Sequence, residues 1–205
     1  MSWLWAFLGL VVVAYVVPGP DWVVILRQSV RDRRAGLVAA AGVQCGLCVH
    51  LAAASLGVSA LLLRSALAFT ILKIAGAAYL IFLGAQALWR SRRNAEPYSE
   101  EPAADGPLTR IFGQALVSNV LNPKAALFFV SLLPQFVDPA AAVAPQVLLL
   151  GGIDVAVGIV WWVLFVALTG RLSGFMRRAK ARRMLDRVTG TALVGLGAGV
   201  AATAR

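Results

Sequence analysis

The chain has 205 residues, of which 60% are hydrophobic and only 14% are charged. Soluble domains carry about 25% charged residues, so this composition excludes both an ordinary soluble globule and a disordered chain. Six apolar segments of about 20 residues each, the length that crosses a bilayer, would use most of the hydrophobic residues present. The composition therefore predicts an all-α polytopic membrane protein.

The hydropathy pattern divides the chain into six apolar segments. The first follows directly on Met1, without a basic n-region or a small-x-small cleavage site, and is therefore interpreted as a span of the mature protein rather than a secretory signal. The six predicted spans are 3–26, 36–63, 65–89, 111–136, 144–169 and 186–203.

Prolines interrupt the first and the fourth predicted span. The first contains Pro18-Gly19-Pro20-Asp21 and the fourth contains Asn122-Pro123-Lys124. Proline lacks the backbone N–H and clashes with the preceding turn, so helices 1 and 4 are expected to break near mid-depth.

The two interrupted spans each begin one half of the chain, which suggests an internal repeat. Residues 1–90 would form the first three-helix repeat, 91–110 a polar linker, and 111–205 the second repeat. Three spans per half reverse the direction of the chain, so the repeat would be an inverted 3+3 repeat. Paired interrupted segments in two halves mark the binding sites of secondary transporters.

The charge is strongly basic, with a formal net charge of +10 and 19 Lys and Arg residues. Most of these lie in three loops, 27–34, 90–110 and 171–187, rather than in a continuous basic face, and they give no reason to expect nucleic acid as a partner. Cytoplasmic loops of membrane proteins are enriched in Lys and Arg. The three loops are therefore predicted to be cytoplasmic and both termini external.

Four ionisable residues, Asp21, Lys73, Lys124 and Asp154, fall within or at the edge of the apolar spans. A charge at the bilayer centre costs about 2.5–3.5 kcal/mol on insertion scales, so such groups usually pair or line a wet cavity. Two acids and two bases suggest two ion pairs. These pairs either hold the bundle together or bind a zwitterion and carry protons.

The helix breaks offer a second argument for a binding site. Asn122 can cap the half-helix that begins at Pro123, and Pro20 can open another half-helix after Gly19. Half-helix N-termini carry a partial positive charge that suits a carboxylate. Because the two spans enter the membrane from opposite sides, both breaks lie toward its middle and could meet there.

Cys45, Cys48 and His50 resemble a cluster of metal ligands, but their spacing argues against one. On a helix the two cysteines share a face, whereas His50 lies about 140° from Cys45. His50 is interpreted as a histidine that is either hydrogen-bonded within the bundle or titrates near neutral pH. No metal or cofactor is expected. No hydrolase, P-loop or zinc-protease motif is present, so the chain is not expected to be an enzyme.

Small residues recur at four-residue spacing in Gly42/Gly46 and in Gly195/Gly199. Such pairs allow helices to approach closely. They are compatible with packing inside one chain and with a homodimer, and the sequence leaves both open.

Several motifs in order resemble the LysE/RhtB-type amino-acid exporters of bacteria, over nearly the whole chain. They are Pro18-Gly19-Pro20-Asp21, Gly42-x-x-x-Gly46-x-x-x-His50, Lys73-Ile-Ala-Gly76-Ala-Ala-Tyr79, Phe112-Gly113, Asn119, Asn122-Pro123-Lys124-Ala125 and Pro134-Gln135-Phe136. The resemblance implies a secondary transporter in the bacterial inner membrane, surrounded by lipid, that exports amino acids or similar small solutes by proton antiport.

The sequence-based hypothesis is alternating access about a central cavity between the two breaks. Lys124 or Lys73 would hold the substrate carboxylate, and Asp21 or Asp154 would hold its ammonium group or a proton. Tyr79 and Asn119 would orient the ligand. A cation or metal exporter of similar fold and a non-transporting membrane scaffold subunit are the alternatives.

Overall fold

The computed structural model describes residues 2–64, 66–92, 106–138, 140–169 and 179–202. Every regular element in these ranges is helical, so the all-α prediction is confirmed for them. Some side chains within α3, α4 and α9, those of Lys73 and Tyr79 among them, lie outside what the structure describes.

The described helical elements follow one another along the chain. In chain order they are α1 (Ser2–Val16), α2 (Pro20–Arg31), α3 (Arg33–Arg64), α4 (Ala66–Arg92), α5 (Leu108–Val120), α6 (Pro123–Leu127), the π-helical turn η1 (Phe128–Leu132), the 3₁₀ turn η2 (Leu133–Phe136), α7 (Val143–Ala167) and α9 (Ala179–Ala202).

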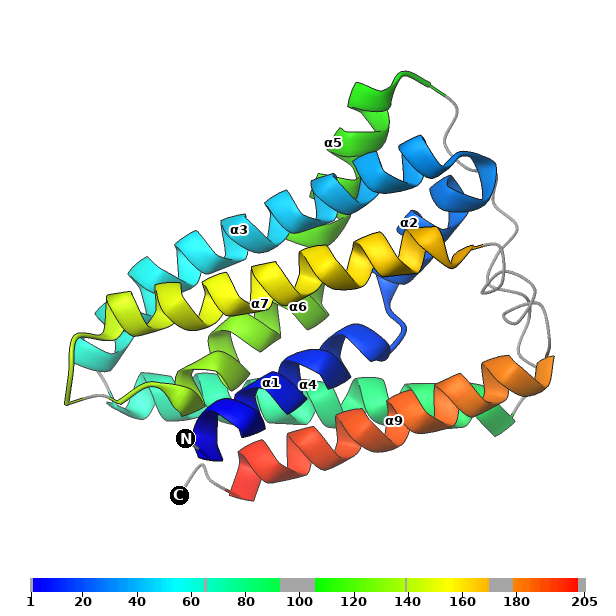
Figure 1. The fold of residues 1–205 in the computed structure, drawn as a ribbon. Coiled ribbons are helices and arrows are strands. Elements are labelled where there is room, and N and C mark those ends of the chain that lie inside the picture. Colours follow the sequence, from blue (N-terminus) through cyan, green and yellow to red (C-terminus); the bar gives the residue numbers. More distant parts are fainter. Residues whose placement is uncertain (1, 65, 93–105, 139, 170–178, 203–205) are drawn as a thin grey trace.

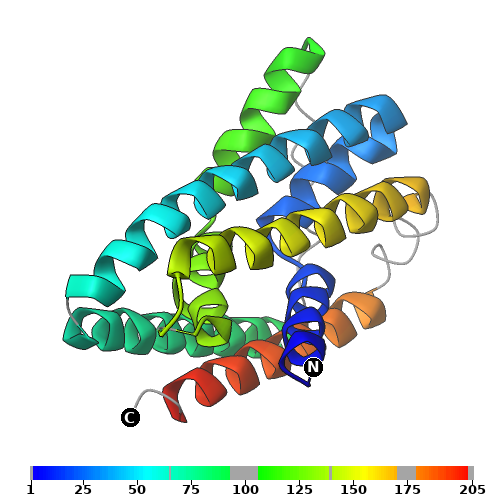
Figure 2. The ribbon, with the colours of Figure 1, turned by 60° about the vertical axis from the view of Figure 1, so that its left-hand side comes forward.

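Two groups of helices make up the bundle. The long helices α3 and α7 run side by side, and α3 also packs against α2 and α5 (Figure 1). The second group consists of α4 and α9, which are paired along their length (Figures 1 and 2). The short helix α1 and the segment from α6 to η2 lie between these groups (Figure 1).

Two helices are long and apolar enough to cross a membrane by themselves, α3 over Arg33–Gly57 and α7, each with a 25-residue stretch. Two bent pairs also qualify if each pair is one span. These are α1 with α2, bent by 57°, and α5 with the segment Pro123–Phe136, bent by 48°. The described part of the chain therefore holds two to four candidate spans.

All three predicted basic loops are partly helical, because α4 continues to Arg92 and α5 starts at Leu108 within the loop 90–110. The loop 27–34 is reduced to a reversal at Asp32, because α2 continues to Arg31 and α3 starts at Arg33. Asp32 makes this short turn possible: its N–H closes α2 on the carbonyl of Gln28, and its carboxylate caps α3 at the N–H of Ala35. The predicted loop 171–187 is likewise shortened, since α9 begins at Ala179.

Glycines allow close contact between helices in both groups. A Cβ atom at Gly84 of α4 would lie 2.7 Å from the carbonyl oxygen of Gly190 in α9. A Cβ atom at Gly42 of α3 would lie 2.5 Å from the carbonyl oxygen of Phe112 in α5. Gly42 and Gly46 therefore serve packing within the chain, whereas a Cβ atom at Gly195 would meet nothing within 4 Å.

Gly84→Ala should lower the free energy of unfolding in detergent by about 1–3 kcal/mol, the usual cost of overpacking. The added methyl group would meet backbone of α9, which cannot rotate away. Gly152→Ala is the control, because its methyl group has open space and alanine favours a helix by up to about 1 kcal/mol. Denaturant titrations followed by circular dichroism would measure both, and equal stability of the two variants would contradict the packing role.

Candidate functional site

The site is built where the two helix breaks meet. Helix α1 ends at Val16 and α2 begins at Pro20; α5 ends at Val120 and α6 begins at Pro123. Each proline occupies the first turn of the new helix, where a missing N–H costs nothing because that donor has no partner inside the helix. The breaks touch, since a Cβ atom at Gly19 would lie 3.5 Å from the Lys124 side chain.

Lys124, from the second break, closes the open end of α1. Its ammonium group donates to the carbonyl oxygens of Ala14 and Val17, at 2.7 Å in each case. The indole N–H of Trp22 donates to the carbonyl oxygen of Tyr15 at 2.7 Å. The last carbonyls of a helix lack intrahelical donors and carry partial negative charge, so a cation fits there.

Asp21, from the first break, is held by two amides of the second. Its Oδ2 atom accepts from the Nδ2 atoms of Asn119 at 3.1 Å and of Asn122 at 2.9 Å. Its Oδ1 atom is buried and has no hydrogen-bond partner. The Oδ1 atom of Asn122 meanwhile accepts from the Lys124 N–H, as the predicted cap of α6. One asparagine thus links the α6 cap to the carboxylate.

The sequence suggested two ion pairs among four charged residues without assigning partners, and the structure shows other contacts for Asp21 and Lys124. The carboxylate binds amide N–H groups, and the ammonium group binds backbone carbonyls. The physical reason is that each break frees backbone groups that must be satisfied inside the membrane. The ammonium group of Lys124 satisfies two such carbonyls, those of Ala14 and Val17.

Asp154 approaches the same place from the middle of α7 and is 3% exposed. The hydroxyl of Tyr15 donates to its backbone carbonyl at 3.2 Å. One residue further on, the Nε2 atom of Gln44 donates to the carbonyl of Val155 at 2.8 Å. Gly158 leaves room for both donors, because a Cβ atom there would collide with the Tyr15 and Gln44 side chains.

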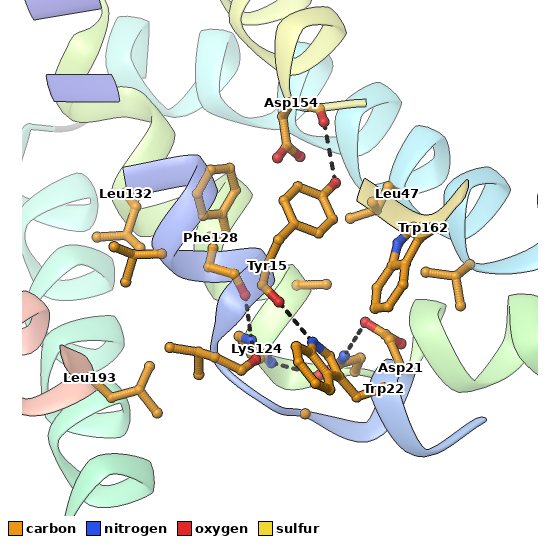
Figure 3. A pocket seen from close by; sticks show the side chains of 17 residues that line it. Tyr15, Asp21, Trp22, Leu47, Lys124, Phe128, Leu132, Asp154, Trp162 and Leu193 are labelled. Atoms are coloured by element: carbon orange, nitrogen blue, oxygen red, sulfur yellow. Dashed lines mark hydrogen bonds between the residues drawn. The ribbon is translucent and has the colours of Figure 1, made fainter. Parts of the chain in front are cut away.

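A cavity of about 70 Å³ lies between these groups. This is space for a few water molecules or a small polar group. Figure 3 shows Lys124 and Asp21 at one end and the Asp154 carboxylate pointing in from the other. The rest of the wall is mainly apolar, and its larger members include Trp22, Leu47, Phe128, Leu132, Trp162 and Leu193.

His50 supports the site without lining the cavity. Its Nε2 atom lies 3.0 Å from the carbonyl oxygen of Asn119, and its ring stacks on Phe129 with the centroids 6.2 Å apart. A carbonyl oxygen only accepts, so Nε2 carries the hydrogen. Cys45 and Cys48 are free and exposed on α3. Among the residues that the structure describes, no three His, Cys, Asp or Glu side chains gather as metal ligands would.

The structure brings together most of the residues singled out in the sequence. One cavity is lined by five of them, namely Gly19, Asp21, Asn122, Lys124 and Asp154. Asn119 is fully buried beside them, packed against Gly46, where a Cβ atom would lie 2.5 Å from its Oδ1 atom. Pro18, Pro20 and Pro123 form the breaks themselves. Lys73 and Tyr79 belong to α4, and their side chains lie outside the described part of the structure.

The sequence did not indicate that the aromatic residues Tyr15, Trp22 and Trp162 belong to the cavity wall. Charges, prolines and asparagines in apolar segments are the signals that point to a site. Tyrosine and tryptophan are common in membrane helices and carry no such signal. The position of Tyr15 and Trp22, within four residues of the Pro18 break, was the only available clue.

Comparison with known proteins identifies the family to which this arrangement belongs. The family model described as LysE type translocator matches residues 12–203. The chain belongs to this family. It is therefore a membrane transporter, and the resemblance seen in the motifs is confirmed. No solved structure shows a significant match to the chain.

Curated relatives of this LysE-family chain cover most of its length. The homoserine/homoserine lactone efflux protein of Salmonella typhimurium (strain LT2) is 32% identical over 96% of this chain and 95% of its own. An uncharacterized membrane protein of Vibrio cholerae is 34% identical over 95% of this chain and 94% of its own. The leucine efflux protein of Salmonella choleraesuis is 35% identical over 67% of this chain and 64% of its own.

Lys124→Met should strongly destabilise the protein. It removes the donor from two carbonyls at the end of α1, and each unsatisfied buried group costs about 1–3 kcal/mol. Lys180→Met, at an exposed position of α9, is the matched control and should change stability by less than about 0.5 kcal/mol. Thermal unfolding in detergent would show the difference, and coincident unfolding curves for the two variants would argue against this role of Lys124.

Proposed function

We propose that this LysE-family transporter exports amino acids or related small zwitterionic solutes across the bacterial inner membrane in exchange for protons. Curated relatives are named as efflux proteins, either for homoserine and its lactone or for leucine. The cavity at the meeting of the two breaks supports the proposal, because it presents both signs of charge to one small space.

The observation that carries the proposal is the state of the Asp21 carboxylate. Two amides fix its Oδ2 atom, while its Oδ1 atom is buried without a donor. A buried acceptor without a partner is costly, so the site is suited to receive a donor. A substrate ammonium group and a proton are the two donors that an amino-acid exporter would bring there in turn.

Lys124 is suited to the other end of the substrate. An ammonium group has three hydrogens, and two of them are used for the carbonyl oxygens of Ala14 and Val17. The third remains for a carboxylate in the cavity that Lys124 lines. Asp154 supplies a second acidic group to the same cavity, and Lys73 and Tyr79 remain candidates on α4.

The pairing of helices supports an inverted 3+3 repeat with six spans. Helix α3 packs against α7, and α4 packs against α9. These are the second and third spans of 1–90 and their counterparts in 111–205. The first spans of the two halves meet at their breaks. A two-fold axis in the membrane plane pairs corresponding elements in this way.

The position of the basic residues supports an orientation. One end of the bundle lies opposite both termini (Figure 1). It holds the α2–α3 turn, the ends of α4 and α7, and the starts of α5 and α9. This end carries Arg31, Arg33, Arg34, Arg92 and Arg110. By the positive-inside rule it would face the cytoplasm, with the termini outside.

Asp21→Asn should remove the response of amino-acid transport to a pH gradient, because a side-chain amide does not bind and release a proton near neutral pH. Transport of radiolabelled amino acid in reconstituted vesicles should respond to an imposed pH gradient in the wild type and not in the variant. Asp138→Asn, at an exposed position between η2 and α7, is the matched control and should keep the response. A variant that responds as the wild type does would remove Asp21 from proton coupling.

A further inference from the structure

A second, larger cavity of about 470 Å³ adjoins the first. It is bordered by α1, by the turns η1 and η2, and by the C-terminal half of α9. Its lining is almost entirely apolar and rich in small residues, namely Ala6, Gly9, Leu10, Val13, Leu132, Gln135, Phe136, Ala192, Gly195 and Gly199.

The two cavities share a wall. Val13 and Leu132 line both of them. Helix α9 borders both cavities with two consecutive residues. Leu193 lines the central cavity, and Ala192 lines the larger one. Among the described residues, two aliphatic side chains from opposite halves of the protein therefore lie between the charged site and the larger space.

Glycines keep the larger cavity open rather than serving helix packing. A Cβ atom at Gly9 or Gly195 would meet nothing within 4 Å. By contrast, a Cβ atom at Gly197, on another side of α9, would come within 2.8 Å of the Ala77 carbonyl oxygen in α4. The small residues of the cavity wall thus border empty space, not a neighbouring helix.

Aromatic rings pack together on the opposite side of the central cavity. The ring centroids of Trp22 and Phe165 lie 4.6 Å apart, those of Trp162 and Phe165 5.3 Å, and those of Tyr15 and Trp162 6.0 Å. Trp162 and Phe165 belong to the last turns of α7, and Trp22 to the first turn of α2. Both helices lead from there to the basic end of the bundle (Figure 1).

We propose that the larger cavity is the exit vestibule of the transport pathway, and that Val13 and Leu132 form the outer gate between it and the central site. The proposal rests on the proposed function, which supplies a small solute moving away from the basic end. The vestibule lies toward the two chain termini, on the side that the positive-inside rule assigns to the exterior. Apolar constrictions of this kind control passage by excluding water.

The test fills the vestibule without touching the charged site. Gly9→Leu and Gly195→Leu should reduce export from loaded vesicles by about tenfold or more, equivalent to about 1.4 kcal/mol. Stabilisation of the protein against heat by the same amino acid should stay as in the wild type. Gly152→Leu is the matched control, since Gly152 also has open space and lies in α7 but lines neither cavity. It should export normally.

If Gly9→Leu and Gly195→Leu export at the wild-type rate, the larger cavity is not the exit vestibule, and the proposed function is unaffected. A wild-type protein that neither binds nor exports any amino acid would instead overturn the proposed function, and the vestibule with it. The loss of export and of thermal stabilisation together would show damage to the central site and would also reject the proposal.

A second experiment distinguishes an aqueous exit from a lipid groove or a dimer surface. In a Cys45→Ser, Cys48→Ser background, Gly195→Cys should react with a membrane-impermeant cationic thiol reagent applied at the external face, and the reaction should stop export. Gly152→Cys should not have this effect. A thiol at position 195 that resists the reagent, or a Gly195→Leu variant that changes a dimer into a monomer in detergent, would overturn the proposal.

Discussion

The structure depends on the mutual satisfaction of two broken backbones inside the membrane. A bilayer offers no water to free carbonyl and N–H groups, so every break must be closed by protein. Here the ammonium group of Lys124 closes the carbonyl end of α1, and the amides of Asn119 and Asn122 hold the carboxylate at the start of α2. The break between α5 and α6 thus supplies the donors for the carbonyls of α1 and for the carboxylate of α2, and these hydrogen bonds hold the two breaks together.

This arrangement explains why the charged residues do not simply neutralise one another. Asp21 and Lys124 lie in one cavity, yet each is engaged by neutral groups, and each keeps bonding capacity in reserve. A directly paired site would be stable but would have little to offer a passing zwitterion. A site with an unpartnered acceptor and an ammonium group with one unused hydrogen can exchange internal contacts for contacts with a solute, which is what a transporter of the LysE family requires.

The two sides of the charged cavity are unequal. Large aromatic rings from α1, α2 and α7 pack together on the side toward the basic end, whereas among the described residues a valine and a leucine lie between the site and a larger space on the other side. Aromatic rings fill volume and pack edge to face, so they form a thicker layer than two aliphatic side chains. The layer of side chains around the site is therefore thicker toward the basic end of the bundle than toward the chain termini.

The sequence alone determined the all-helical membrane class, the family, and a small set of candidate polar residues, because proline, asparagine and charge in apolar segments are signals that need no coordinates. It did not determine which groups bond to which. Two ion pairs were expected among the four charged residues, whereas the structure holds Asp21 by side-chain amides and Lys124 by backbone carbonyls. The sequence also carried no sign that Tyr15, Trp22 and Trp162 line the cavity. The vestibule also depends on tertiary structure. In the sequence Gly195 belongs to a small-residue pair typical of helix packing, whereas in the folded chain a Cβ atom at Gly9 or Gly195 would meet nothing within 4 Å. Helix breaks and buried charges can be predicted from the sequence because they follow from the chemistry of single residues. Hydrogen-bond partners and cavities cannot, because they depend on how helices distant in the sequence pack together.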